Sequence, residues 1–139
     1  YRTGDIASDL SHGCACGRGL QILEGLQGRA HDFIVAPDGR FVHGQFFTHL
    51  LVFEKGIVKY QVIQEEKDLL VVKLVIDGRY SRESESRFLN AVTDYLGAEV
   101  RIEFEYVESI ALTDVGKHRW IISKVASRQH DARKNQNAA

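Results

Sequence analysis

The fold is decided by the stretch Leu69-Leu70-Val71-Val72-Lys73-Leu74-Val75-Ile76, an apolar run of strand length with a single charge. A run of this kind is typical of a strand that is mostly buried. Residues 57–65 are also rich in β-forming side chains, and only Glu66-Lys67-Asp68 lies between the two runs. We expect so short a connection to join an antiparallel pair at the centre of the core.

Two helices are predicted beside this pair. The shorter one precedes it and has apolar side chains at helical spacing, namely Phe46, Phe47, Leu50 and Leu51. Gly56 follows this helix where a left-handed cap would sit. The longer helix follows the pair and has an apolar face made by Phe88, Val92, Tyr95 and Leu96. Its start is acidic and Gly97 lies just past its end, as the helix dipole and the C-terminal cap prefer.

A β-hairpin is predicted upstream, where Phe33-Ile34-Val35 and Phe41-Val42 flank the turn sequence Ala36-Pro37-Asp38-Gly39-Arg40. A last strand is predicted at residues 100–106, in which apolar and charged side chains alternate. The elements together predict an α+β fold: a small antiparallel sheet with two or three helices, plus the N-terminal β-hairpin. Fold class alone leaves the function open.

Composition excludes several classes of protein. A chain of 139 residues fits one ordinary domain. Lys and Arg total 18 against 19 acidic residues, and this balance gives no field that would recruit nucleic acid or an anionic membrane. No apolar run approaches the roughly 20 residues that span a bilayer, and two cysteines cannot make a disulfide framework. We therefore expect a cytoplasmic protein without a nucleic-acid or membrane partner.

Three segments carry residues that can do chemistry. The first, Tyr1-Arg2-Thr3-Gly4-Asp5, presents a carboxylate that can accept two hydrogen bonds from a vicinal diol, although Asp5 alone is equally a turn or cap residue. In the second, Gly28 to Val35, Arg29 offers bidentate donors to phosphate or hydroxyl groups and Asp32 can orient it, unless the two only form a surface ion pair.

The third segment is Thr113-Asp114-Val115-Gly116-Lys117-His118-Arg119. Gly116 frees the backbone beside Lys117, whose ammonium can reach a neighbouring site and neutralise charge that develops on a carboxylate or phosphate. The segment lacks the upstream glycine spacing of a phosphate loop. Taken singly, Lys117 is better explained as a solvated loop lysine.

Together, in this order and spacing, the three segments resemble the AMP-forming adenylating superfamily of acyl-CoA synthetases, peptide-synthetase adenylation domains and luciferases. The sequence between them includes His12-Gly13-Cys14-Ala15-Cys16-Gly17-Arg18-Gly19-Leu20 and residues 33–40. These stretches are most similar to the phenylacetate-CoA ligase and CapK-like branch. The resemblance runs from Tyr1 to about Val125 and concerns the C-terminal domain of those enzymes.

The resemblance implies a role for individual residues. Asp5 would bind the ribose hydroxyls of ATP, and Arg29 would lie near the same ribose. In the first reaction step a carboxylic acid would attack the α-phosphate of ATP, which is bound with Mg²⁺, and form an acyl adenylate with release of pyrophosphate. Lys117 would bridge the substrate carboxylate and the nucleotide during this step. Rotation of the domain would then withdraw Lys117 and bring the hairpin near Gly39 to the thiol channel, where CoA attacks the adenylate.

The hinge of this rotation would lie at His31 and Asp32. Relatives usually have Asp or Lys at the position two after Arg29, and this chain has His31 there. Hinge residues need only absorb a change in φ and ψ, so rotation remains expected. A histidine pivot would in addition make domain closure sensitive to pH.

The resemblance also implies how the chain is divided. Residues 1–27 would be a glycine-rich loop and connector from the end of a missing N-terminal adenylate-binding domain, residues 28–126 the C-terminal lid domain, and residues 127–139 a polar, disordered tail. The sequence contains no Ser/Thr/Gly-rich phosphate loop and no acyl pocket. We therefore expect a phenylacetate-CoA ligase-like enzyme only in the full-length protein, and an inactive fragment here. The alternative is a freestanding α+β ligand-binding or regulatory module.

A possible metal site is formed by His12, Cys14 and Cys16, three ligands that Zn²⁺ accepts within five residues. The set is one ligand short of a tetrahedron, and its spacing is tighter than that of a Cys-x2-Cys knuckle. Either a structural zinc takes a further ligand from elsewhere, or the two thiols are reduced and buried in the connector.

Overall fold

A computed structural model describes residues 32–126 in full, together with Gly17 and the backbone of four short strands nearer the N-terminus. The chain divides into two compact units, Tyr1–Ala30 and His31–Ala139. The assignment of residues 28–126 as a lid domain stays a prediction, and the tail predicted at residues 127–139 lies outside the described residues.

The N-terminal unit contains short strands where the sequence predicts a loop. Strand β1 (Asp5–Ala7) pairs antiparallel with β4 (Leu26–Arg29), and β2 (Leu10–Ser11) pairs antiparallel with β3 (Ile22–Leu23). The prediction of loop was wrong for these strands, because segments of two to four residues are too short to show an alternating pattern.

The C-terminal unit is built on a four-stranded sheet in the order β10-β7-β8-β9. Strands β7 (Ile57–Glu66) and β8 (Leu69–Ile76) form the predicted antiparallel pair at its centre. The outer strands β9 (Arg101–Tyr106) and β10 (Ile121–Ser123) run parallel to β8 and β7 respectively. The predicted α+β class is confirmed, but the sheet is mixed and not antiparallel throughout.

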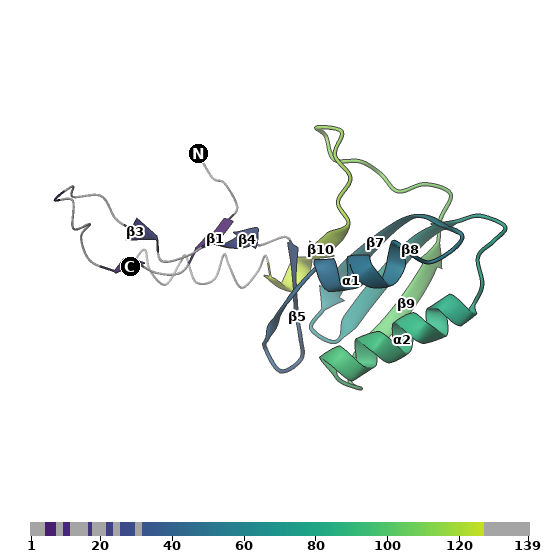
Figure 1. The fold of residues 1–139 in the computed structure, drawn as a ribbon, viewed down its shortest axis with the longest axis horizontal. Helices are drawn as coiled ribbons and strands as arrows, with labels where there is room; N and C mark the ends of the chain where they lie inside the picture. The colour runs from purple at the N-terminus through teal and green to yellow at the C-terminus, as the bar shows by residue number, and fades with distance from the viewer. Residues whose placement is uncertain are drawn as a thin grey trace. The chain divides into compact units, whose positions relative to one another are not determined.

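Long connections explain the parallel outer strands. Strand β8 is followed by helix α2 (Glu83–Leu96), and residues 107–120 connect β9 to β10 at the opposite edge of the sheet (Figure 1). Helix α2 returns the chain to the end of the sheet at which β8 begins, so β9 runs parallel to β8. Residues 107–120 instead cross to the opposite edge, where β10 runs antiparallel to β9 and therefore parallel to β7. The sequence pattern of β9 predicts a strand but does not contain its direction.

Both predicted helices are present and pack on one side of the sheet. Helix α1 (Gln45–Leu51) buries Phe47 and Leu51, and α2 buries Phe88, Val92 and Leu96. The helices contact each other through the rings of Phe47 and Phe88, whose centroids are 6.4 Å apart. The same core contains Val62 of β7 and Val72 of β8, both fully buried. None of the helices in the described part of the chain is long and apolar enough to cross a bilayer.

Gly56 has a positive φ of 84°, but it lies in the turn before β7 and does not cap α1, which ends at Leu51. A Cβ atom at Gly56 would lie 2.2 Å from the backbone nitrogen of Tyr80. The backbone N–H of Asp77 also donates to the carbonyl oxygen of Gly56 at 2.8 Å. Gly56 therefore allows two turns at one end of the sheet to touch, and the prediction of a helix cap was wrong.

The predicted hairpin is formed by β5 (Phe33–Val35) and β6 (Phe41–His43). Gln64 of β7, which is fully buried, attaches the hairpin to the sheet. Its Oε1 accepts hydrogen bonds from the backbone N–H of Val35 at 3.0 Å and from Ser123 Oγ at 2.7 Å. Its Nε2 donates to the carbonyl oxygen of Val35 at 2.6 Å. One buried amide thus joins β5, β7 and β10.

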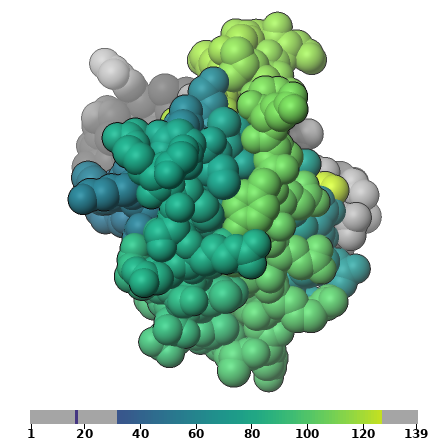
Figure 2. All heavy atoms as spheres, turned by 90° about the vertical axis from the view of Figure 1, so that its right-hand side faces the viewer, coloured from purple at the N-terminus to yellow at the C-terminus, as the bar shows by residue number. Residues whose placement is uncertain are grey.

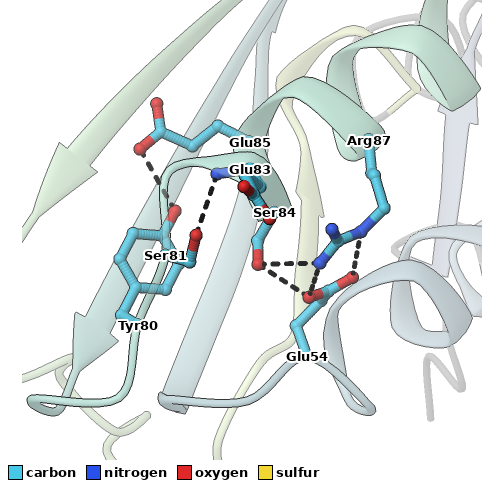
Figure 3. A network of polar contacts seen from close by, with 7 residues as sticks. All are labelled: Glu54, Tyr80, Ser81, Glu83, Ser84, Glu85 and Arg87. Atoms are coloured by element: carbon cyan, nitrogen blue, oxygen red, sulfur yellow. Dashed lines mark hydrogen bonds and ion pairs between the residues drawn. The ribbon is translucent and has the colours of Figure 1, made fainter.

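A polar network joins the turn after α1 to the start of α2 (Figure 3). Glu54 Oε2 accepts hydrogen bonds from Ser84 Oγ and from Arg87 Nη2, both at 2.7 Å. Arg87, and then Ser84, lower the pKa of the Glu54 carboxyl from its usual value. Beside them, Ser81 Oγ accepts a hydrogen bond from the backbone N–H of Glu83 at 3.2 Å and so satisfies one free donor at the helix start.

Candidate functional site

Lys117 lies at the end of a closed turn that projects from the body of the C-terminal unit. The turn, drawn in yellow-green, stands clear of the sheet in Figure 1 and of the surface in Figure 2. The backbone N–H of Thr113 donates to the carbonyl oxygen of Lys117 at 2.9 Å, and Lys117 N–H donates to Thr113 Oγ1 at 3.0 Å. Gly116 has φ of 75°, which suits glycine in a tight turn. The Lys117 side chain is exposed.

The three residues after Lys117 are hydrogen-bonded to three consecutive residues of β7. His118 Nε2 lies 2.9 Å from the carbonyl oxygen of Tyr60, and because a carbonyl only accepts, Nε2 carries the proton. Gln61 Nε2 donates to the carbonyl oxygen of Arg119 at 2.8 Å. Val62 N–H donates to the carbonyl oxygen of Trp120 at 2.8 Å. These bonds fix the base of the turn to the central strand.

Aromatic packing strengthens the same base. The rings of Tyr60 and Trp120 have centroids 4.7 Å apart, and those of His118 and Trp120 are 4.2 Å apart in an edge-to-face arrangement. His118 Nδ1 is buried and has no hydrogen-bond partner among the described residues. The backbone that carries Lys117 is therefore held firmly, while its side chain is free to reach outward.

The tip of the hairpin is the second predicted feature of the site. Gly39 is exposed, with φ of 92°, and its N–H donates to the carbonyl oxygen of Ala36 at 2.8 Å. Beside it, Arg40 Nε pairs with Asp38 Oδ2 at 2.5 Å, and this hydrogen bond lowers the pKa of the Asp38 carboxyl. Arg40 Nη2 also donates to the carbonyl oxygen of Tyr95 at 3.1 Å. The tip is thus attached to the end of α2.

The other predicted site residues are placed only in part. In the N-terminal unit, the β1–β4 ladder sets the backbone of Asp5 opposite that of Arg29. In the C-terminal unit, Asp32 is exposed before β5, and its carbonyl oxygen accepts a hydrogen bond from Gly44 N–H at 2.6 Å. No described contact joins Lys117 to Gly39 or to Asp32.

Four predicted residues, His12, Cys14, Cys16 and His31, lie outside the described residues. The described part of the chain contains no group of three or more His, Cys, Asp or Glu residues that could hold a metal ion. The zinc proposal therefore stays a prediction.

The sequence reasoning missed the residues that hold the Lys117 turn. Gln61, His118 and Trp120 make these contacts, and Gln61 is separated from Arg119 by 58 residues. The one signal in the sequence was the polar residue Gln61 within a run of apolar, β-forming residues. A buried amide requires a hydrogen-bond partner, so Gln61 indicated that another segment contacts this strand.

The chain matches a family model described as the CapK C-terminal domain over residues 34–124. Among curated proteins, no sequence matches it. Of the solved structures, fatty acyl-adenylate ligases from E. coli and L. pneumophila match with a TM-score of 0.53 and 18% identity, covering 100% of this chain and 23% of that chain. Because the identity is low, this likeness concerns the fold alone.

Two other solved structures match with lower TM-scores. One is 2-hydroxyisobutyryl-CoA ligase in complex with 2-HIB-AMP and CoA, at a TM-score of 0.48 and 21% identity, covering 86% of this chain and 28% of that chain. Another is a variant of the amide bond synthetase McbA from Marinactinospora thermotolerans, which matches at a TM-score of 0.48 and 24% identity and covers 93% of this chain and 24% of that chain. The chain spans about a quarter of the length of these proteins.

Proposed function

Since the chain belongs to the CapK C-terminal domain family, we propose that it is the C-terminal lid portion of an AMP-forming acid–thiol ligase. In this proposal the remainder of the enzyme is an N-terminal domain of the same protein, which contains the ATP pocket and the acyl pocket. The fold likeness to fatty acyl-adenylate ligases, which are several times longer than this chain, supports such a division. The isolated chain is then inactive.

The observation that carries the proposal is the presentation of Lys117. Its side chain is exposed on a projecting turn, while the following residues are hydrogen-bonded to β7. An ammonium delivered from a firm base can enter a pocket on another domain and neutralise charge that develops between a carboxylate and the α-phosphate. A loosely held lysine would lose much of this effect because its position would have to be fixed during the reaction.

The proposed reaction has two steps. A carboxylic acid attacks the α-phosphorus of ATP, the bond to the bridging oxygen of pyrophosphate breaks, and an acyl adenylate forms; Mg²⁺ accompanies the nucleotide and offsets its phosphate charge. In the second step the thiol of CoA attacks the acyl carbon, loses its proton, and AMP leaves. Lys117 acts in the first step only.

The remaining predicted residues fit this scheme as follows. The backbones of Asp5 and Arg29 are opposite each other in the β1–β4 ladder, which supports a common role of the two residues at the ATP ribose. His31 and Asp32 form the hinge. The hairpin tip at Gly39 approaches the thiol after rotation, and its attachment to α2 through Arg40 means that the tip moves with the whole unit.

The proposal also concerns the class of acid that is activated and the molecule that accepts the acyl group. The resemblance to the phenylacetate-CoA ligase branch favours an aryl acid as substrate and CoA as the acceptor. ATP–pyrophosphate exchange by the full-length protein, measured with a panel of aromatic and aliphatic acids, tests both the reaction and the substrate class. Exchange that depends on an aromatic acid supports the proposal, and a full-length protein that shows no exchange with any acid contradicts it. Release of AMP upon addition of CoA then tests the acceptor.

A further inference from the structure

A pocket of about 350 Å³ lies between β6, α1 and the end of α2, away from the Lys117 turn. Its walls include the imidazoles of His43 and His49, the amide of Gln45, the apolar side chains of Phe46 and Leu50 and the phenol ring of Tyr95. The volume is at the lower end of the range for small-molecule sites, and such sites combine an apolar lining with a few polar groups. None of these residues has a part in the proposed adenylation reaction.

His43 is held in one orientation and one tautomer. The backbone N–H of Gln45 donates to His43 Nδ1 at 3.1 Å, so the neutral ring carries its proton on Nε2. The edge-to-face contact with Phe33, at 5.1 Å between centroids, also holds the ring. The nitrogen that is left for a ligand is therefore a hydrogen-bond donor. His49 adds a second exposed imidazole from the last turn of α1.

Two aromatic rings, those of Phe46 and Tyr95, belong to the wall of the pocket. The rings of Phe46 and Tyr95 are stacked, with centroids 4.5 Å apart and planes 24° apart, and the guanidinium of Arg40 lies over the Tyr95 ring at 5.7 Å. These two contacts hold the Tyr95 ring in place. Ring edges carry the positive end of the quadrupole and attract the π-face of another arene.

The lining offers a cationic ligand no opposite charge. None of the lining side chains, all of which belong to the described residues, is acidic. The nearby Arg40 is paired with Asp38 at 2.5 Å, so the polar groups of the lining itself are two imidazoles, one amide and the phenol of Tyr95. Hydrogen-bond donors and aromatic rings together suit an arene that bears hydrogen-bond acceptors.

We propose that this pocket binds a small aromatic anion, an arene with a carboxylate or phosphate group, whose oxygens accept hydrogen bonds from His43 and Gln45 and whose ring packs on Phe46 and Tyr95. This site is independent of the proposed ligase function. The chemistry common to a carboxylate and a phosphate is an anionic oxygen, and the experiment separates the two.

The test is a titration of the chain, monitored by the imidazole C–H signals in NMR spectra. Benzoate and phenyl phosphate are the anionic probes, benzamidine is the cationic probe of similar size, and EDTA removes metal ions that could bridge imidazoles. His43→Gln and His49→Gln identify the two signals, and His118, outside the pocket, is the internal control. We expect both pocket signals to shift with one Kd of about 1 mM for an anionic probe. Tighter binding of either probe identifies the preferred anion.

Gln45→Glu supplies a matched change of charge at an exposed position in the first turn of α1, where an acid suits the helix dipole. We expect it to weaken binding of the anionic probe about tenfold and to leave the thermal unfolding midpoint unlowered. Shifts that do not saturate, equal shifts with benzamidine, or unchanged affinity in Gln45→Glu would each overturn the proposal.

Discussion

The imidazole Nε2 of His118 lies 2.9 Å from the backbone carbonyl oxygen of Tyr60, so the residue that follows Lys117 is hydrogen-bonded to the central strand. Gln61 repeats this arrangement one residue further along, because its amide donates to the carbonyl oxygen of Arg119. Two side-chain contacts between residues far apart in the sequence thus fix the position of the Lys117 turn relative to β7.

Replacing His118 by Phe tests this contact. Phe keeps an aromatic ring against Trp120 but removes the Nε2–H donor, and a partly buried carbonyl left without its partner costs about 1–2 kcal/mol. We expect acid adenylation by the full-length protein to slow, with little change in the KM for ATP, because the ammonium is misplaced and not lost. His118→Asn or His118→Gln, which retain an N–H donor, should recover part of the rate. A purely structural role would instead lower both half-reactions equally.

Replacing Gln64 by Leu should destabilise the C-terminal unit strongly. The change leaves the N–H and carbonyl of buried Val35 without their side-chain partner. The expected loss is about 3 kcal/mol in the free energy of unfolding, measured with urea. Gln45→Leu, at an exposed position, is the matched control and should change the stability by less than about 0.5 kcal/mol. Equal effects of the two variants would show that the buried amide does not hold the hairpin.

The Glu54–Arg87 contact should make the stability depend on pH. Arg87 lowers the folded-state pKa of Glu54 from the model-compound value of 4.5, so the folded state binds the proton less readily than the unfolded state. The contribution is therefore complete above about pH 4.5 and is lost as the pH falls through the folded-state pKa. Urea unfolding at near-neutral pH and at about pH 3 measures the change. Between these two pH values the Glu54→Gln variant should lose less stability than the wild type. The control variant Glu99→Gln, changed at an exposed position, should lose as much stability as the wild type.

Gly56 and Gly116 provide a matched pair of backbone tests. Both have positive φ, of 84° and 75°, but a Cβ at Gly56 would lie 2.6 Å from the Cα of Tyr80, whereas a Cβ at Gly116 meets nothing within 4 Å. Gly116→Ala should cost only the backbone strain, about 1 kcal/mol. Gly56→Ala should cost about 3 kcal/mol or more because the two turns must separate. Similar thermal unfolding midpoints for both variants would contradict the close contact of these turns.

Much of the fold could be predicted because its signals are local. The face of α2 follows from apolar residues at helical spacing, and the hairpin follows from Pro37-Asp38-Gly39 between two β-forming runs. The direction of β9 and β10 could not be predicted in this way. It depends on where α2 and residues 107–120 return the chain, and the packing of those connections is decided by contacts far apart in the sequence.

Part of the candidate site could likewise be predicted from local sequence signals, and part could not. Gly116 beside Lys117 indicates a turn with an exposed ammonium, and the structure contains that turn. The residues that hold it could not be identified, because nothing local to Gln61 indicates that its partner is the backbone of Arg119. Similarly, the opposition of Asp5 and Arg29 follows from the pairing of two strands too short to leave a pattern in the sequence.

The central claim is that the ammonium of Lys117 acts in the formation of the acyl adenylate and in no later step. The most direct measurement compares the two half-reactions of the full-length protein in Lys117→Ala and in Lys55→Ala, the latter an exposed lysine in the turn after α1. The account predicts that Lys117→Ala slows ATP–pyrophosphate exchange by about 100-fold or more while preformed acyl adenylate is still consumed at the wild-type rate, and that Lys55→Ala changes neither. Exchange at the wild-type rate in Lys117→Ala would contradict it.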